Sequence, residues 1–285
     1  MTGGRTLEIA AGAWRAGIRA ETGGALAYLS RADNDVLRAM PAHSLRAAEA
    51  GCYPLVPFAG PIRLGRFTLN GRAVRLPPNA PPLRHPVDGI GWQRPWGLDS
   101  MVGAAVDLVL DHGGGLGWPW PFRARQRFEL DSQGLTIELS LTNEGRDPMP
   151  AGLGLRASLR RWRDSHLRFA ARKVLLADIE GIPTGETVAA DHFGDWSAGL
   201  DMPSSTVDST YREWDGALTL TDGLGTITLT TQGASYLHVF APGSARAMVL
   251  SPLNHLPDAL SRDDWPMPML APGETARLAM RIEAQ

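Results

Sequence analysis

Residues 82–96 (PLRHPVDGIGWQRPW) bring together the side chains that could do chemistry. His85 and Asp88 supply an imidazole and a carboxylate, which are groups that enzymes use for general acid and base catalysis. Trp92 offers a flat aromatic face that can pack on a small ring, and Arg94 offers several hydrogen-bond donors. The segment therefore predicts a binding site for a small molecule, with proton transfer as its chemistry.

Other familiar catalytic and metal-binding patterns are incomplete in this chain. Residues 112–115 (HGGG) resemble the oxyanion loop of lipases, but no G-x-S-x-G nucleophile motif completes it. The seven histidines are scattered without the spacing of a zinc site, and no phosphate-binding glycine loop occurs. Cys52 lies in an apolar run, which favours a buried side chain over a nucleophile. We therefore expect no metal and no cofactor.

The composition favours a globular protein with a small-molecule partner. Hydrophobic residues make up 44% of the chain and charged residues 20%, which suffices for a large core. A net charge of −2 gives no attraction for nucleic acid or an anionic membrane. No stretch approaches the ~18 apolar residues of a membrane span, and a single cysteine fits a reducing compartment. We expect a cytoplasmic protein, as a monomer or homodimer, without nucleic-acid or membrane partners.

The chain reads as many short strands separated by turns. Its 32 glycines and 22 prolines fall between short runs of alternating apolar residues. Asn70-Gly71 predicts a tight hairpin turn between strands at 66–69 and 72–76. Further strands are expected at 104–110, 123–130, 135–143, 217–221, 225–231, 236–241 and 277–283. A short helix is expected only at 42–50.

Strands at this spacing without intervening long helices predict an all-β fold, an antiparallel sandwich or barrel. No shift in composition marks a boundary, so one domain is expected over residues 1–285. Residues 156–173 carry the one strong basic bias. They are interpreted as a solvated strand and loop face, or alternatively as a segment that attracts an anionic substituent of a ligand.

Several short segments follow one another in a set order along the chain. They are 35–41 (DVLRAMP), 51–59 (GCYPLVPFA), 65–67 (GRF), 88–96 (DGIGWQRPW), 118–124 (WPWPFRA), 149–155 (MPAGLGL), 207–208 (VD) with 214–216 (WDG), 257–259 (PDA) and 270–274 (LAPGE). Taken together, they resemble the aldose 1-epimerase (galactose mutarotase-like) family over nearly the whole chain. The resemblance implies a large antiparallel β-sandwich.

The family resemblance also implies a reaction and a set of residues. Mutarotation needs a base at the anomeric hydroxyl and an acid at the ring oxygen of a sugar. The family uses a glutamate base, two histidines, an Asn-Arg pair and an aspartate. At the matching positions this chain has Ser251, the pair Asp88 and Arg156, and Gly60-Pro61, and it keeps only the aspartate, as Asp208. Arginine does not transfer protons at working pH, and serine is a poor base.

A replacement set is therefore expected. Asp88 is the candidate base, and His85, His238 or His255 is the candidate acid, with Asp208 retained. For His85 and His255 the alternative is a structural hydrogen bond in a loop. The candidate substrate-binding residues are Arg156, Trp92, Arg94 and Ser251. An ion pair between Asp88 and Arg156 is the structural alternative for those two, because a buried charge without a partner is costly.

Three functions remain open from the sequence. The first is an aldose 1-epimerase-like isomerase that acts on a sugar or modified sugar by acid and base catalysis with a non-standard site. The second is a carbohydrate-binding pseudoenzyme. The third is a recruited site that catalyses another proton transfer on a small oxygenated ring.

Overall fold

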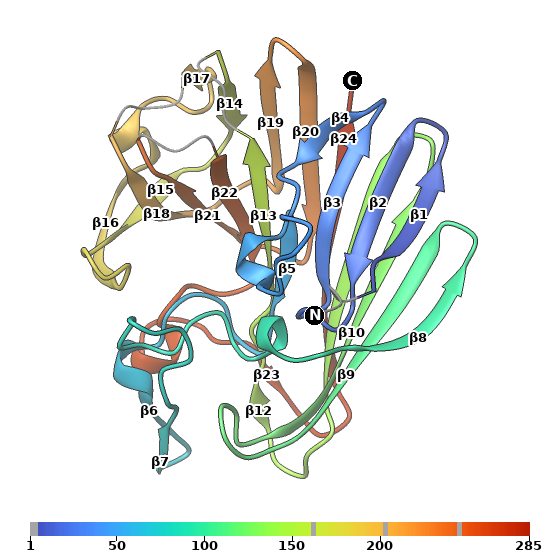
Figure 1. The fold of residues 1–285 in the computed structure, drawn as a ribbon. Coiled ribbons are helices and arrows are strands. Elements are labelled where there is room, and N and C mark those ends of the chain that lie inside the picture. The colour runs from blue at the N-terminus through green and yellow to red at the C-terminus, as the bar shows by residue number, and fades with distance from the viewer. Residues whose placement is uncertain (1–4, 161–163, 202–204, 244–246) are drawn as a thin grey trace.

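The computed structural model describes residues 5–160, 164–201, 205–243 and 247–285. In these ranges the largest element is an eleven-stranded sheet in the order β1-β2-β3-β4-β13-β22-β21-β18-β15-β16, with β5 pairing to β3 and β13 (Figure 1). Its strands are β1 (Leu7–Ala11), β2 (Trp14–Arg19), β3 (Ala25–Arg31), β4 (Asn34–Leu37), β5 (Cys52–Leu55), β13 (Gly154–Arg160), β15 (Lys173–Ala177), β16 (Pro183–Ala189), β18 (Val207–Arg212), β21 (Tyr236–Ala241) and β22 (Ala247–Leu253).

A second sheet packs against the first. Within the described ranges it has nine strands in the order β17-β14-β19-β20-β24-β11-β10-β9-β8. Its strands are β8 (Gly97–Val102), β9 (Ala105–Gly113), β10 (Pro121–Leu130), β11 (Gly134–Asn143), β14 (His166–Phe169), β17 (Leu200–Asp201), β19 (Ala217–Asp222), β20 (Gly225–Gln232) and β24 (Thr275–Ala284). The named strands of both sheets pair antiparallel throughout, as in β10 on β11 and β13 on β22.

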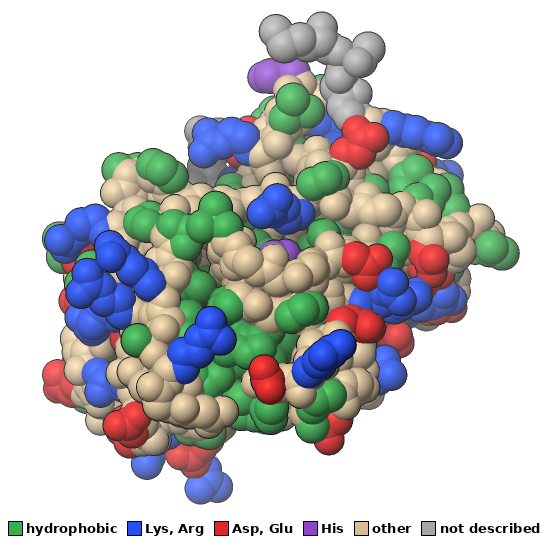
Figure 2. All heavy atoms as spheres, turned by 90° about the horizontal axis from the view of Figure 1, so that it is seen from below, with side chains coloured by type: hydrophobic (Ala, Val, Ile, Leu, Met, Phe, Trp, Pro, Cys, Tyr) green, Lys and Arg blue, Asp and Glu red, His purple; other side chains and the backbone are tan. Residues whose placement is uncertain are grey.

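Small elements lie around the two sheets. The short pairs are β6 (Arg66–Leu69) with β7 (Arg72–Arg75), and β12 (Met149–Pro150) with β23 (Met269–Leu270). Single 3₁₀ turns are η1 (Ala47–Glu49), η2 (Arg63–Gly65), η3 (Gly91–Gln93), η4 (Ala190–Phe193) and η5 (Ala259–Ser261). Figure 2 looks onto the end of the molecule that carries the β6–β7 hairpin, where hydrophobic side chains gather at the centre and charged ones surround them. No helix among the described residues is long and apolar enough to cross a membrane.

The core lies between the two sheets. In β11 the alternating residues Leu135, Ile137, Leu139 and Leu141 are fully buried, as a strand with one covered face requires. They join one apolar cluster with residues of the facing sheet such as Leu155. The fold is thus a large antiparallel β-sandwich, and the all-β class expected from the sequence is confirmed. Because the cluster extends from β1 to β24, we propose that the chain is one domain.

The opposite face of the eleven-stranded sheet carries the polar residues of interest. In β13, Leu155, Ala157 and Leu159 point into the core and are fully buried. Side chains alternate between faces along a strand, so Arg156 projects from the other side of the sheet. A smaller apolar cluster covers part of that side; it contains Ala25, Ala27, Met40, Ala47, Ala50, Tyr53, Leu55, Ala59 and Leu253.

Most of the expected strands form where the alternation is strong. The predicted hairpin is present as β6 and β7, with Asn70 and Gly71 at positive φ of 50° and 76°. The helix expected at 42–50 is reduced to the single turn η1, because Arg46 gives it no side-chain cap and a short helix does not outweigh its nucleation cost.

Candidate functional site

A row of five polar side chains crosses the middle of the eleven-stranded sheet. Tyr53 of β5 lies opposite Arg156 of β13, and the register of β13 on β22 continues the row to Ser251. Ser251 lies opposite His238 of β21, which in turn lies opposite Thr210 of β18. Opposed residues in antiparallel strands have Cβ atoms about 4.5–5.5 Å apart on the same face. Strands far apart in sequence therefore assemble one polar row.

His238 is held by two partners on β18. Its Nε2 lies 3.2 Å from Oδ1 of Asp208, and its Nδ1 lies 3.0 Å from Oγ1 of Thr210. Burial raises the pKa of Asp208, but the hydrogen bond and charge of His238, followed by the charge of Arg156, bring it below its usual value. Asp208 is thus a carboxylate at neutral pH that orients an imidazole, the side chain that most often transfers protons in enzymes.

Arg156 supplies the positive charge of the site. Its Nη1 lies 3.9 Å from Oδ2 of Asp88, and its side chain is 24% exposed. Burial lowers the pKa of Arg156, but Tyr53 and then the carboxylates of Asp88 and Asp208 outweigh it and raise the pKa. The ion pair expected between Asp88 and Arg156 is confirmed, although 3.9 Å is too long for a hydrogen bond. The guanidinium therefore stays charged and keeps donors for a ligand.

The backbone fixes the position of Asp88. The Asp88 Oδ1 atom accepts the N–H of Gly60 at 2.8 Å, and the Asp88 N–H donates to the Gly60 carbonyl at 3.0 Å. Asp88 adopts the left-handed conformation with φ of 60°, which an aspartate tolerates better than most side chains. Gly60 has a φ of 72°, and a Cβ there would lie 2.6 Å from Cβ of Pro257. This reciprocal contact leaves Oδ2 as the oxygen that faces Arg156.

Ser251 is the enclosed member of the row. It is 1% exposed, and its hydroxyl has no hydrogen-bond partner among the described residues. Because the hydroxyl is enclosed, the structure favours a supporting position between Arg156 and His238 over direct contact with a substrate. A buried hydroxyl without a partner costs on the order of 1–3 kcal/mol.

His85 and His255 both make structural hydrogen bonds. His255 is 2% exposed; its Nδ1 donates to the Leu256 carbonyl at 2.7 Å and its Nε2 accepts the Ala59 N–H at 3.0 Å. Burial lowers the pKa of His255 to about 4. Nδ1 of the buried His85 accepts the Leu64 N–H at 2.9 Å. The geometry favours the structural alternative for both residues, which leaves His238 as the candidate acid.

Trp92 and Arg94, the aromatic and cationic candidates of segment 82–96, lie in different surroundings. Trp92 is half-buried, and its ring lies 5.7 Å from the ring of Tyr53, at the end of the polar row. Arg94 is exposed and makes no side-chain hydrogen bond or ion pair with the described residues. Trp92 thus remains a candidate platform for a ligand beside Arg156, whereas no contact joins Arg94 to the row.

Three contributors to the site were missed or left open at the level of sequence. Tyr53 and Thr210 were not singled out, and His238 was one of three candidate acids. Within the alternating strand at 236–241, His238 has the parity opposite to the apolar Leu237 and Val239, and this was the signal that could have identified it.

The basic segment 156–173 does not form one solvated face, because β13 is central in the sheet. Residues 161–163 of this segment lie outside the described ranges. No group of three or more His, Cys, Asp or Glu side chains in those ranges could hold a metal.

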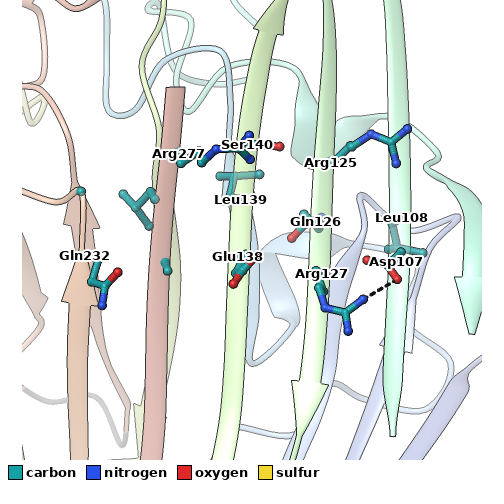
Figure 3. A pocket seen from close by; sticks show the side chains of 13 residues that line it. Asp107, Leu108, Arg125, Gln126, Arg127, Glu138, Leu139, Ser140, Gln232 and Arg277 are labelled. Carbon is teal, nitrogen blue, oxygen red and sulfur yellow. Dashed lines mark hydrogen bonds and ion pairs between the residues drawn. The ribbon is translucent and has the colours of Figure 1, made fainter. Parts of the chain in front are cut away.

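A separate groove of about 400 Å³ crosses the outer face of the nine-stranded sheet (Figure 3). Arg127 in this groove binds Asp107 at 2.8 Å, and Arg125 binds Asp99 at 2.8 Å. These two pairs satisfy their own charges, whereas Glu138 and Arg277 of the groove make no ion pair with the described residues, and no histidine lines the groove. We therefore place the candidate site on the face that carries His238.

Comparison with known proteins agrees with the fold and with the resemblance of the sequence. The profile of the family described as aldose 1-epimerase matches residues 6–283. A protein of Escherichia coli K12 named YphB and described as uncharacterized is 27% identical over 250 residues, covering 83% of this chain and 85% of the relative. A crystal structure from the same organism, provisionally described as an aldose 1-epimerase, has a TM-score of 0.90 at 25% identity and covers 99% of both chains. The structure of a galactose mutarotase-like protein of Clostridium acetobutylicum has a TM-score of 0.87 at 17% identity, and the match covers 98% of this chain and 95% of the Clostridium chain. The chain belongs to the aldose 1-epimerase family.

Proposed function

We propose that the protein interconverts the anomers of a sugar or modified sugar on the face that carries His238, Asp208 and Asp88. The observation that supports this most is the His238–Asp208 pair at 3.2 Å, beside Arg156, in a chain of the aldose 1-epimerase family. Carboxylates accept hydrogen bonds from sugar hydroxyls, and a guanidinium donates to sugar oxygens. Asp88, Asp208 and Arg156 thus offer both hydrogen-bond acceptors and hydrogen-bond donors to one sugar ring.

The proposed chemistry divides proton transfer between Asp88 and His238. Oδ2 of Asp88 is not used by Gly60 and takes the proton of the anomeric hydroxyl. In its imidazolium form, which the Asp208 carboxylate stabilises, His238 gives its Nε2 proton to the ring oxygen and becomes a neutral imidazole. The 3.2 Å contact with Asp208 is at the long end of hydrogen-bond distances, so a sugar oxygen can share this donor. Ring opening and reclosure then give the other anomer, and Arg156 holds a neighbouring oxygen.

A second candidate is a carbohydrate-binding protein without turnover. It is favoured by Arg156, which stands where the family has a histidine and which offers only donors. It is also favoured by Asp88, whose carboxylate is already engaged by Gly60 and lies 3.9 Å from Arg156. In this case the row would bind a sugar, and the anomers would exchange at the uncatalysed rate.

Exchange NMR distinguishes the two candidates. Neutral aldoses, sugar acids and sugar phosphates are each mixed with the protein, and magnetisation transfer between anomer signals is measured. Catalysed exchange of at least one sugar is expected, and it should be lost in His238→Gln. His43→Gln, which alters an exposed histidine, is the matched control and should leave the rate unchanged.

Thermal stability of the same mixtures reports on binding. A ligand that binds the native state raises the melting temperature. Stabilisation without catalysed exchange would refute the isomerase and support the second candidate. If no sugar of the panel either exchanges faster or stabilises the protein, both candidates are contradicted.

A further inference from the structure

The loop at residues 178–182 joins β15 to β16 and has a closed, fixed shape. The Asp178 carboxylate accepts the N–H of Glu180 at 2.9 Å and that of Ile182 at 3.0 Å through the same oxygen. The Asp178 N–H donates to the Ile182 carbonyl at 2.9 Å, and the Gly181 N–H donates to the Asp178 carbonyl at 3.0 Å. These four hydrogen bonds hold the loop in one defined turn conformation.

One side of this loop lies against the candidate site. A Cβ placed on Gly181 would lie 3.8 Å from Oδ2 of Asp208. Gly181 has a φ of 74°, a conformation that a glycine adopts readily. The loop therefore approaches the carboxylate that orients His238 with backbone alone.

The other side of the loop is bound to the segment that carries Asp88. Arg84 grips the Glu180 carboxylate through Nε at 3.0 Å from Oε1, and through Nη2 at 2.7 Å from each carboxylate oxygen. The buried His85 places its Nε2 3.7 Å from Oε2 of Glu180. Since His85 Nδ1 accepts the Leu64 N–H, the proton of a neutral ring is on the nitrogen that faces Glu180.

A lone exposed ion pair contributes little to stability, so the Arg84–Glu180 pair by itself would not indicate a coupling between the two segments. Here the carboxylate is held by a forked arginine and also faces a buried imidazole, and charge-assisted forked contacts are geometrically specific. The hydrogen bond from Arg84 is the main cause that lowers the pKa of Glu180, so the carboxylate stays ionised. Both partners stand three to four residues before Asp88 in the sequence.

We propose that Glu180 is a positioning residue that ties the loop beside Asp208 to the segment carrying Asp88, and so fixes the two carboxylates relative to each other. The catalytic consequence rests on the proposed function. The mechanical coupling between residues 82–90 and 178–182 does not.

Hydrogen exchange measured by mass spectrometry or NMR tests the coupling without any substrate. In Glu180→Gln the amides of both residues 178–182 and residues 82–90 should exchange several-fold faster, including that of Asp88. Glu186→Gln is the matched control, since Glu186 is an exposed residue of β16, and it should change neither segment. Faster exchange confined to 178–182, or none at all, overturns the proposal.

A charge swap adds a readout that a purely structural role would not move. Arg84→Glu combined with Glu180→Arg rebuilds the pair with reversed polarity but places a guanidinium opposite the Nε2–H of His85, so it should restore part of the protection that each single variant loses in both segments. On a sugar that the wild type interconverts, Glu180→Gln should lower kcat more than it raises KM, and the swap should recover part of kcat. If the wild type interconverts no sugar, the proposed isomerase fails while the exchange data still decide the coupling. Failure of the swap to restore protection at residues 82–90 contradicts the role of Glu180.

Discussion

Acidification should destabilise the protein through His255, whose surroundings set the size of the effect. The ring is 2% exposed, and both nitrogens are used, one by the Leu256 carbonyl and the other by the Ala59 N–H. A second proton would have to displace the Ala59 N–H in an enclosed space. Burial accordingly lowers the pKa of His255 to about 4.

The direction follows from comparing the folded and unfolded chains. The pKa of an unfolded histidine is about 6.5, so as the pH falls the unfolded chain takes up this proton first. The contribution of neutral His255 to stability is therefore complete above about pH 7 and is lost as the pH falls from 6.5 towards 4. At about 1.4 kcal/mol per pKa unit, the loss between pH 7 and pH 5 is roughly 2 kcal/mol.

Urea unfolding of the wild type and of His255→Gln at pH 7 and pH 5 measures this loss. Glutamine can still accept the Ala59 N–H but does not titrate. On acidification the free energy of unfolding of the variant should therefore fall by roughly 2 kcal/mol less than that of the wild type, whatever its value at pH 7. An NMR titration of the His255 ring should give a pKa near 4. Equal losses in both proteins, or a measured pKa above 6, would refute the reasoning.

Four further substitutions have defined outcomes. Ser251→Ala removes a buried hydroxyl without a partner, so the free energy of unfolding in urea should stay the same or rise by about 1 kcal/mol; a clear fall would mean that the hydroxyl has a partner. Leu139→Ala, at a fully buried core position, should lower that free energy by about 3 kcal/mol, whereas Leu116→Ala at a position 78% exposed should change it by less than about 0.5 kcal/mol; similar losses for the two would contradict the core assignment. Arg156→Ala should abolish the rise in melting temperature given by any sugar that stabilises the wild type; an unchanged rise would place the ligand elsewhere.

The fold could be predicted where a strand has one buried face. Leu135, Ile137, Leu139 and Leu141 alternate with polar residues because β11 has the core on one side and solvent on the other. The strand β13 could not be assigned in this way. It lies in the middle of the sheet with most of its residues buried on both faces, and its basic residues have partners distant in sequence, such as Asp222 at 3.3 Å from Arg160. Local sequence holds no information about such a partner.

The site could be predicted in part for a related reason. Short motifs predict Asp88, Asp208 and Arg156; the structure pairs Arg156 with Asp88 at 3.9 Å, and the charges of both carboxylates raise the pKa of Arg156. The pairing of His238 with Asp208 depends on the register of β21 on β18, which is set by strand packing and not by neighbours in sequence. His255 was a candidate acid from the sequence, but in the structure it holds loop backbone in place, because its two ring nitrogens bind the Ala59 N–H and the Leu256 carbonyl.

The rate of anomer exchange in the matched pair Asp208→Asn and Asp201→Asn tests the central claim most directly. Asp208 holds His238 at 3.2 Å, whereas Asp201 lies on β17 in an exposed pair with His166. On a sugar that the wild type interconverts, exchange NMR should show a large loss of rate for Asp208→Asn and a wild-type rate for Asp201→Asn. A wild-type rate in Asp208→Asn would contradict a catalytic site built on the His238–Asp208 pair.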